Sequence, residues 1–384
     1  MKRNSGHPRG WRPAHLEDLV FFQRGFDITK AEQRQGNIPV VSSSGIQSYH
    51  SEAKVEGPGV VIGRKGSLGT VHFVDCPYWP HDTTLWSKDL RGNDPRYVYY
   101  FVHTMGFERY DVGNSNPTLN RNHIHGLDIL IPPLRTQKAI VEVLSTYDDL
   151  IENNRRRIQL LEQAARLLYK EWFVHLRFPG HEHTQIIDGV PEGWENTLLP
   201  DVIDVNPKTP VEKGKEILYV PMSALSEAGM TANTADFERR TTHTAVKFKK
   251  SDVLLARITP CLENGKTGYV YFLGDDEVAC GSTEFIVLRG KSVSPAFTYC
   301  LARSYPFRGN AIKSMIGSSG RQRVQVSCFD EYKVPLPPKH LLEMFDDIAN
   351  TAFDQIRVLV AQNDKLTKAR DLLLPKLMNG EVVV

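Results

Sequence analysis

The sequence predicts an α+β protein: two α/β domains at opposite ends of a long antiparallel two-helix coiled coil, with pseudo-twofold symmetry. Two observations predict this architecture. A long helical pattern occurs twice, and a domain-sized segment precedes each copy. The chain has 384 residues, of which 41% are hydrophobic and 24% are charged, so it can bury two cores of ordinary size.

The repeated helical pattern opens each time on a double proline. The first copy starts at residues 131–133 (Ile-Pro-Pro), and the second starts 205 residues later at 336–338 (Leu-Pro-Pro). Proline is well tolerated at the start of a helix, where its missing N–H costs nothing. Superposing the copies without gaps aligns identical residues at Thr146 and Thr351, Ile151 and Ile356, Leu161 and Leu366, Ala164 and Ala369, Leu167 and Leu372, and Leu168 and Leu373.

The apolar positions of each copy alternate in steps of four and three, which keeps one seam of a helix facing a partner helix. The second helix should fray or stop at Pro375. The first seam comprises Ile140, Leu144, Tyr147, Ile151, Asn154, Ile158, Leu161, Ala165, Leu168 and Trp172. The second seam comprises Phe345, Ala349, Ala352, Ile356, Leu359, Asn363, Leu366, Arg370, Leu373 and Leu377.

An antiparallel register that places Asn154 opposite Asn363 matches the two seams almost throughout. A buried asparagine pair typically fixes register and orientation at some cost in stability. The alternative is two unrelated amphipathic helices that each pack on their own domain. The same register pairs Trp172 with Phe345, Ala165 with Ala352, Leu161 with Ile356, and Tyr147 with the aliphatic stem of Arg370.

Antiparallel pairing places the two domains at opposite ends of the helices. The predicted boundaries are 1–130 for the first domain, 131–178 for the first spacer helix, 179–335 for the second domain and 336–384 for the second spacer helix. At ~1.5 Å per residue the paired stretch would be about 48 Å long, which exceeds one turn of duplex DNA.

The two domains share weaker signals. A proline-x-glycine-tryptophan element occurs at residues 8–11 and again at 191–194, and an apolar run ends in arginine at Arg64 and again at Arg257. A polar stretch with small residues precedes each double proline, at 113–122 and 317–323. The chain therefore reads as a domain followed by a helix, twice.

These features, with several local motifs, resemble the specificity subunit of a Type I restriction-modification enzyme over essentially the whole chain. The motifs are IPVVSSSGI at 38–46, GPGVVIGRKGSLG at 57–69, DTTL at 82–85 and DVLLARITPCLENGKTG at 252–268. At the helix starts, 339–342 (Lys-His-Leu-Leu) replaces the family's acidic-glutamine element, and 135–137 (Arg-Thr-Gln) keeps only its glutamine.

The resemblance implies two target recognition domains that read a bipartite target in double-stranded DNA, separated by conserved spacer helices. It also implies two methyltransferase subunits and ATP-dependent restriction (translocase/nuclease) subunits as partners. S-adenosylmethionine, ATP and magnesium would belong to those partners, and this chain would hold no cofactor and carry out no catalysis.

The net charge of +2 is balanced for a DNA-binding protein, so contacts with DNA must come from local clusters. Any one basic cluster is more often a solvated surface, but the family context favours those in the motifs. The predicted DNA-binding residues are Ser43, Ser44, Arg64, Lys65, Asn120, Arg121, Arg257, Asn264, Lys266, Arg321 and Arg323.

Other chemistry finds little support. Residues 265–267 (Gly-Lys-Thr) resemble the end of a phosphate-binding loop, but Pro260 stands where its first glycine is required. The histidine pairs 123/125 and 181/183 lack further ligands at suitable spacing, and we expect loop positions without a metal. A methyltransferase's catalytic loop is absent, since 206–208 reads Asn-Pro-Lys.

Five widely spaced cysteines and the lack of an apolar segment of membrane-spanning length predict a reduced, cytoplasmic protein that contacts no membrane. Two other classes of function remain open at this point. A standalone DNA-binding regulator would bind its target tightly without a partner, and a structural coiled-coil adaptor would show no salt-dependent affinity for DNA.

Overall fold

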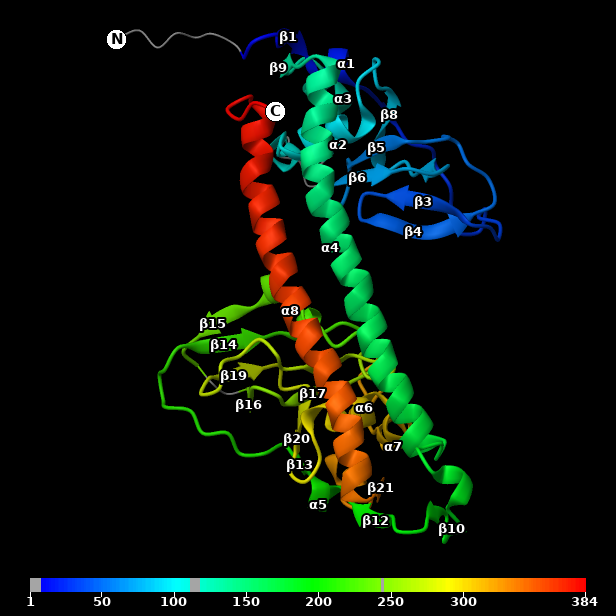
Figure 1. The fold of residues 1–384 in the computed structure, drawn as a ribbon. Coiled ribbons are helices and arrows are strands. Elements are labelled where there is room, and N and C mark those ends of the chain that lie inside the picture. The colour runs from blue at the N-terminus through cyan, green and yellow to red at the C-terminus, as the bar shows by residue number, and fades with distance from the viewer. Residues whose placement is uncertain (1–7, 111–117, 243–244) are drawn as a thin grey trace. The chain divides into compact units, whose positions relative to one another are not determined.

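The computed structural model describes residues 8–110, 118–242 and 245–384, and it divides the chain into two compact units. Unit 1 comprises Met1–Glu152 with Asn363–Val384, and unit 2 comprises Asn153–Gln362. The long helices α4 (Leu134–Tyr169) and α8 (Lys339–Met378) each contribute one part to either unit (Figure 1). Both units combine sheets with helices, which confirms the predicted α+β class.

Unit 1 contains a four-stranded sheet of order β2-β8-β5-β6, a three-stranded sheet of order β4-β3-β7 and the antiparallel pair β1-β9. Its strands are β1 (Arg12–His15), β2 (Phe21–Arg24), β3 (Ile38–Ser42), β4 (Gly45–His50), β5 (Gly59–Gly63), β6 (Val71–Val74), β7 (Trp79–Pro80), β8 (Thr84–Asp89) and β9 (Asp128–Ile131). Its short helices are α1 (Leu16–Leu19), α2 (Pro95–His103), η1 (Phe107–Tyr110) and α3 (Arg121–His125).

Unit 2 contains two four-stranded sheets, β13-β20-β17-β18 and β15-β14-β19-β16, and the antiparallel pairs β12-β21 and β10-β11. Its strands are β10 (Ile186–Ile187), β11 (Val190–Pro191), β12 (Glu195–Leu198), β13 (Ile203–Val205), β14 (Ile217–Val220), β15 (Glu238–Arg240), β16 (Val246–Lys249), β17 (Val253–Ala256), β18 (Thr267–Tyr269), β19 (Val278–Gly281), β20 (Phe285–Gly290) and β21 (Lys333–Leu336). Its helices besides α4 and α8 are η2 (Lys170–Val174), η3 (His181–His183), α5 (Leu199–Val202), η4 (Met222–Ala224), η5 (Thr234–Asp236), α6 (Pro295–Arg303), α7 (Tyr305–Lys313) and η6 (Val326–Phe329).

The two units follow the same plan, as the paired sequence signals suggested. The order β2-β8-β5-β6 in unit 1 matches β13-β20-β17-β18 in unit 2 strand for strand. The second sheets also match, because β3 pairs with β7 in parallel and β14 pairs with β19 in parallel. In each unit an antiparallel pair, β1-β9 or β12-β21, leads into the long helix that follows.

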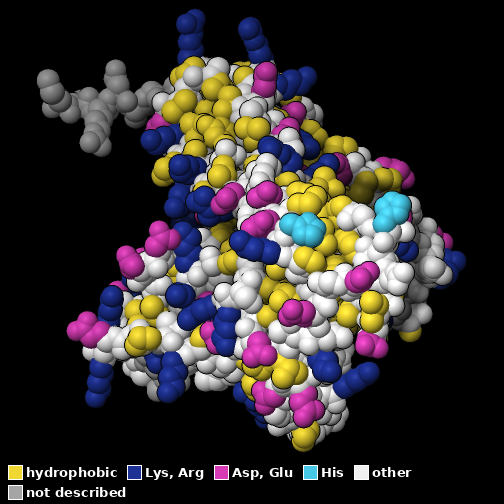
Figure 2. Space-filling view, turned by 60° about the horizontal axis from the view of Figure 1, so that its bottom comes forward, with side chains coloured by type: hydrophobic (Ala, Val, Ile, Leu, Met, Phe, Trp, Pro, Cys, Tyr) yellow, Lys and Arg dark blue, Asp and Glu magenta, His cyan; other side chains and the backbone are white. Residues whose placement is uncertain are grey.

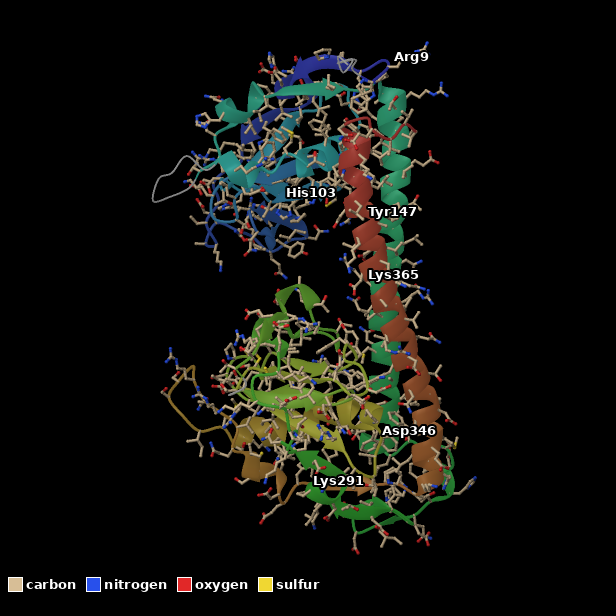
Figure 3. All side chains as sticks on the ribbon, turned by 90° about the vertical axis from the view of Figure 1, so that its left-hand side faces the viewer. Arg9, His103, Tyr147, Lys291, Asp346 and Lys365 are labelled. Carbon is tan, nitrogen blue, oxygen red and sulfur yellow. The ribbon has the colours of Figure 1, made fainter. Side chains whose placement is uncertain are left out.

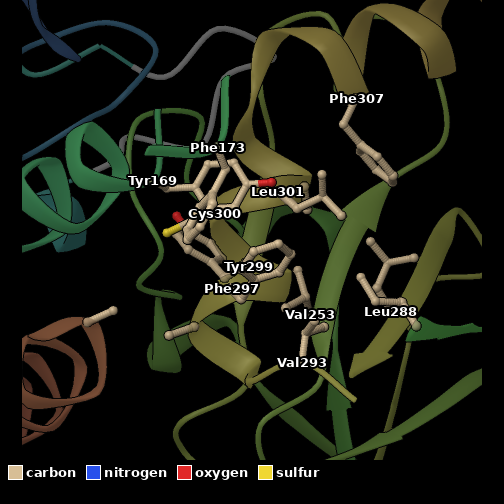
Figure 4. Packing of buried hydrophobic residues seen from close by; sticks show 14 of the residues in the cluster. Tyr169, Phe173, Val253, Leu288, Val293, Phe297, Tyr299, Cys300, Leu301 and Phe307 are labelled. Carbon is tan, nitrogen blue, oxygen red and sulfur yellow. The ribbon is translucent and has the colours of Figure 1, made fainter. Parts of the chain in front are cut away.

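The central strands are buried on both faces, which explains why they read as continuous apolar runs rather than alternating ones. Along β17, Val253 and Leu255 pack with α6 residues in one cluster, while Leu254 packs in another cluster with Phe248 and Val287. Figure 4 shows the first cluster, in which Val253 lies near the rings of Phe297 and Tyr299. The strand β5 is likewise buried at every residue.

In unit 1 the helices pack antiparallel in the predicted register. Ile140 and Leu144 of α4 share a cluster with Leu374 and Leu377 of α8. One turn further along, Arg370 Nη1 donates to Asp148 Oδ1 at 2.6 Å. Tyr147 and Lys365 mark this helix pair in Figure 3.

In unit 2 the register also agrees with the prediction. The rings of Trp172 and Phe345 lie 6.5 Å apart between centroids, and Leu161 packs on the cluster that contains Ile356. The α-helix α4 ends at Tyr169 and continues as the π-helix η2, in which both Trp172 and the adjacent Phe173 are buried. The π turn therefore buries two consecutive rings, of which the predicted seam named only Trp172. The pairing of Asn154 with Asn363 stays a prediction.

The expectation for Pro375 is wrong, because α8 continues through it to Met378. A proline removes one main-chain hydrogen bond, but here only one further turn follows it. That turn is held by burial of Leu374, Leu377 and Met378 in the unit 1 core. Packing outweighs the lost bond. Among the described residues, none of the helices combines the length and apolar character needed to cross a membrane.

Candidate nucleic-acid interface

In unit 1 the three family-like motifs meet at the end of β5. The N–H groups of Arg64 and Lys65 donate to the carbonyl of Thr83 at 2.8 and 3.2 Å. The Ser43 N–H donates to the Thr83 hydroxyl at 3.4 Å. The serine loop at 42–45, the turn after β5 and the DTTL segment therefore form one cluster. Ser44 is exposed on it, whereas Ser43 is buried.

Charged side chains of both signs meet at the centre of this cluster, where carboxylate oxygens of Asp27 and Asp82 lie within 4.8 Å of each other. Arg24 Nη2 lies 2.8 Å from Asp82 Oδ2, and Arg64 Nη1 donates to the Asp82 carbonyl at 3.3 Å. Burial lowers the pKa of Arg64, the nearby charge of Arg24 lowers it further, and Asp82 opposes both effects. Only Arg24 bonds to the Asp82 carboxylate, because Arg64 bonds to the main-chain carbonyl of that residue. Arginine side chains placed in this way suit an anion such as a backbone phosphate.

The segment that begins at Thr118 joins the same cluster through its main chain. The N–H of Leu119 donates to the carbonyl of Arg64 at 2.9 Å, and Lys65 forms a bridge with Thr118. Asn120 caps α3, accepting at Oδ1 from Asn122 N at 3.0 Å, while the guanidinium of Arg121 lies 5.9 Å from the ring centroid of Phe21. Residues 113–117 of the predicted polar stretch lie outside the described residues.

Unit 2 builds the same framework around Arg257. Its N–H donates to the carbonyl of Glu284 at 2.9 Å, and its carbonyl accepts from Val324 N at 2.8 Å. Arg64 makes the matching pair of bonds, since each arginine directly follows the equivalent strand, β5 or β17. The recurring apolar run ending in arginine therefore marks one structural position in both units.

The other candidates of unit 2 surround this arginine. The guanidinium of Arg323 binds Glu284, with Nη2 2.8 Å from Oε1, and this hydrogen bond raises the pKa of Arg323. Lys266 Nζ donates to the carbonyl of Met222 at 3.2 Å, and Asn264 Nδ2 donates to Glu227 Oε1 at 3.0 Å. Arg321 is exposed in the turn before the bridge between Arg323 and Ile258.

Charged residues behind the loops hold this framework, and sequence reasoning missed them. Arg303 is buried, and its Nη2 donates to the carbonyl of Ala228 at 2.9 Å while Nη1 donates to that of Gly265. Arg308 Nη2 donates to the carbonyls of Leu262 and Glu263, both at 2.9 Å. These bonds fix the loop that carries Asn264 and Lys266. They join segments 38 to 75 residues apart, so no local pattern could reveal them.

The other chemical candidates take ordinary structural roles. His125 lies on α3 rather than on a loop, and its Nε2 accepts from the N–H of Phe22 at 3.1 Å. Thr267 begins a strand, so the Gly-Lys-Thr element leads into no helix. Asp27, His81 and Asp82 are the group of three possible metal ligands in the described part of the chain, and the sequence reading did not single them out. Asp82 in that group is already paired with Arg24.

Charged side chains of both signs are mixed on the surface (Figure 2). The candidate interface in each unit is therefore a local feature rather than part of a broad basic face, in agreement with the small net charge. Both units have the same arrangement of sheets, an arginine at the same position (Arg64 or Arg257) and part of the two long helices. Together these features define a protein with two equivalent recognition domains, each attached to a helical spacer.

Comparison with known proteins identifies the family. The family model described as Type I restriction modification DNA specificity domain matches residues 8–163 and 191–343, and the chain belongs to that family. Its two matched regions carry the two loop clusters. The resemblance found in the sequence is therefore confirmed, and the chain is of the Type I specificity-subunit class.

Named relatives agree with this assignment. The chain is 26% identical over 305 residues to the Type I restriction enzyme MjaIX specificity subunit of Methanocaldococcus jannaschii, covering 75% of this chain and 69% of that protein. It is 34% identical over 155 residues to the EcoEI specificity subunit of Escherichia coli, covering 39% of this chain and only 26% of that protein.

A solved structure supports the fold. The S subunit of a Type I restriction-modification system from M. genitalium superposes with a TM-score of 0.59 at 15% identity, covering 98% of each chain. At this identity the similarity concerns the fold alone.

Proposed function

We propose that this chain reads a bipartite DNA target, with one half-site bound at the Arg64 cluster of unit 1 and the other at the Arg257 cluster of unit 2. The observation that carries the proposal is the equivalent position of the two arginines. Each follows the central strand of its sheet and is held by the same two main-chain bonds. A duplicated reader is what a split target requires.

The loop side chains divide into two roles under this proposal. Arginine and lysine bind phosphates and position each domain, while exposed asparagine, serine and arginine side chains read base edges. Each good bidentate contact with a base discriminates by about 1–3 kcal/mol. Ser44, Asn120, Asn264 and Arg321 are exposed candidates for such contacts. Because Arg323 is paired with Glu284, its contact with DNA requires exchange of that partner.

The helices α4 and α8 serve as the spacer and as a docking surface for partner subunits. Apolar side chains remain exposed on them after the antiparallel seam has formed. In unit 2 these include Leu160 at 64%, Ile348 at 53% and Val358 at 48% exposure. Exposed apolar side chains on the helices are the feature that favours a protein partner there. We assign this surface to two methyltransferase subunits, with ATP-dependent restriction subunits joining the assembly.

This chain would supply recognition and no catalysis. S-adenosylmethionine would be bound by the methyltransferase partners, and ATP with magnesium by the restriction partners. Methylating a base within a duplex requires flipping it into the enzyme's pocket. The role of the chain is to place the correct base at that pocket.

The test is single-molecule mapping of methylated adenines in cells that express the chain with its neighbouring methyltransferase, compared with cells that express the methyltransferase alone. A split motif with a fixed unread gap, present only with the chain, is the expected result. Absence of new methylation in a complex shown to be assembled would refute the proposal and favour a standalone regulator or an adaptor.

Matched variants sharpen the test. Arg64→Ala should relax or abolish reading of one half of the motif, and Arg257→Ala should do the same for the other half. Lys333→Ala, an exposed lysine of β21 outside both clusters, should change neither half. Equal effects of both arginine variants on the same half would contradict the assignment of one half-site to each unit.

A further inference from the structure

A basic pocket in unit 2 lies behind the loop that carries Asn264 and Lys266. Two of its basic residues, Arg303 and Arg308, hold that loop, and the function proposed above gives the cavity itself no ligand. It is bounded by the end of α4, the start of η2 and the junction between α6 and α7, with a volume of about 520 Å³. Arg166, Lys170, Arg303 and Arg308 line it, and no aspartate or glutamate of the described chain does. A volume of this size falls within the usual range for small-molecule sites.

The positive charges in this pocket are poorly compensated. Burial lowers the pKa of Arg308, and the nearby charges of Arg303 and Arg166 lower it further, so the three guanidinium groups repel one another. The nearest carboxylate is that of Glu162, 3.6 Å from Arg166 Nη1. That carboxylate already accepts from Tyr299 Oη and Met230 N. An anion in the pocket would relieve the repulsion.

Arg303 and Arg308 supply positive charge to the wall of the pocket. Their Nη atoms donate to main-chain carbonyls, and their Nε atoms are buried without a hydrogen-bond partner. Buried unpaired polar atoms are uncommon. The first turn of α7 adds to this, because its N-cap residue Ser304 lines the pocket and makes no side-chain cap, while Pro306 contributes no N–H. The start of a helix attracts anions through its N–H groups.

One wall of the pocket offers an aromatic ring. Tyr305, the first residue of α7, lines the pocket and is 88% exposed. Exposed tyrosine rings stack on nucleobases. We propose that this pocket binds a nucleoside phosphate, with the phosphate held by Arg166, Lys170 and the start of α7 and the base stacked on Tyr305. The ligand is either a free nucleotide or one residue of a nucleic-acid strand.

The test uses the full chain with two probes, ATP without added metal and a duplex oligonucleotide that lacks the methylation target. The variant Arg166→Gln with Lys170→Gln removes two charges. The control Lys333→Gln with Lys339→Gln removes two exposed charges elsewhere in unit 2. Since Lys170 is exposed, the single variant Lys170→Gln serves if the double variant does not fold. Circular dichroism checks folding.

Two results would support the proposal and distinguish a free nucleotide from a nucleic-acid strand as the ligand. Saturable ATP binding that weakens at least about tenfold in the pocket variant, but not in the control, identifies a free nucleotide. A nucleic-acid strand is identified if no ATP binds and if the slope of log K for duplex binding against log salt concentration falls in magnitude by roughly one or two in the pocket variant. If ATP is the ligand, Tyr305→Ala should also weaken the binding of ATP more than the binding of inorganic phosphate.

If the pocket variant and the control behave alike with both probes, the inference is overturned. Neither probe requires the half-sites to be read, so this failure is independent of the function proposed above. Conversely, a chain that directs no methylation could still bind ATP in this pocket.

Discussion

The carboxylate of Glu162 on α4 connects the helix pair of unit 2 to its domain, and its replacement gives a sharp test of the packing. The side chain is 5% exposed, with Oε1 2.7 Å from Tyr299 Oη and Oε2 2.8 Å from Met230 N. Both bonds are made to segments distant in sequence. Tyr299 itself is buried, and burial together with Glu162 raises its pKa well above the ordinary value.

The expected cost follows from these two bonds. Glu162→Gln keeps the volume; its amide oxygen can accept from Met230 N while its NH2 group donates to Tyr299 Oη. Two charge-assisted bonds then become neutral ones, at a total cost of about 1.5–3 kcal/mol. Glu162→Ala leaves both buried donors without an acceptor and should cost about 3–5 kcal/mol. Tyr299→Phe removes one hydroxyl and should cost about 1–2 kcal/mol.

Hydrogen exchange of the full chain measures the effect within each unit. Exchange of α6 and β17 reports opening of unit 2, while β5 serves as an internal reference in unit 1. At about 1.4 kcal/mol per factor of ten, Glu162→Gln should accelerate exchange in α6 by roughly 10- to 150-fold. The exposed neighbour Gln163→Ala should leave exchange unchanged.

The reasoning is refuted if Glu162→Gln changes α6 exchange by less than about twofold, or if β5 exchange rises equally. A double-mutant cycle with Tyr299→Phe should show coupling of about 1–2 kcal/mol. Additive effects would mean that the two side chains do not depend on each other.

Three further outcomes are expected. Burial lowers the pKa of His125, so the unfolded chain binds the proton more readily than the folded chain does. Unit 1 should therefore lose stability as the pH falls below about 6.5 and keep its full stability above that pH. The variant His125→Gln should flatten the pH profile of hydrogen exchange in β5. Gln137 is 1% exposed, and its side chain forms hydrogen bonds with Asp94 N, Asn93 Oδ1 and Pro132 O at 2.7–3.0 Å. Gln137→Ala should therefore destabilise unit 1 by about 1–3 kcal/mol in the same exchange assay. Replacing the exposed neighbour, Lys138→Ala, should leave the stability of unit 1 unchanged. Phe345→Ala removes a fully buried ring beside Trp172 and should cost unit 2 about 3–5 kcal/mol in the exchange of α6, whereas a cost under 1 kcal/mol would contradict the register.

The helical register could be predicted because it depends on local spacing. Steps of four and three place one face of a helix inward whatever the partner, and the pairing of Trp172 with Phe345 follows from matching two such faces. The strand that ends at Arg64 and its counterpart at Arg257 were also recognisable, since a strand buried on both faces must be apolar throughout.

The buried polar residues could not be predicted in this way. Glu162 follows a seam residue and reads as solvent-facing, yet α6 covers it. Gln137 was noticed only as part of a helix-start element, and two of its partners are Asn93 and Asp94, which lie 44 and 43 residues earlier, just before α2. Such contacts depend on where a domain lies against its helix, which local spacing does not specify.

The duplicated clusters suggest how one fold can read two different half-sites. The two bonds that fix Arg64 and Arg257 use main-chain atoms, so they place no demand on neighbouring side chains. The residue that accepts from each arginine's N–H is Thr83 in unit 1 and Glu284 in unit 2. Around the same framework, Arg64 has Arg24 and Asp82 beside it, while Arg257 lies beside a Glu284 that binds Arg323. Since base recognition depends on side chains and positioning depends on the framework, the halves of the target should differ in sequence while both domains dock on DNA in the same way.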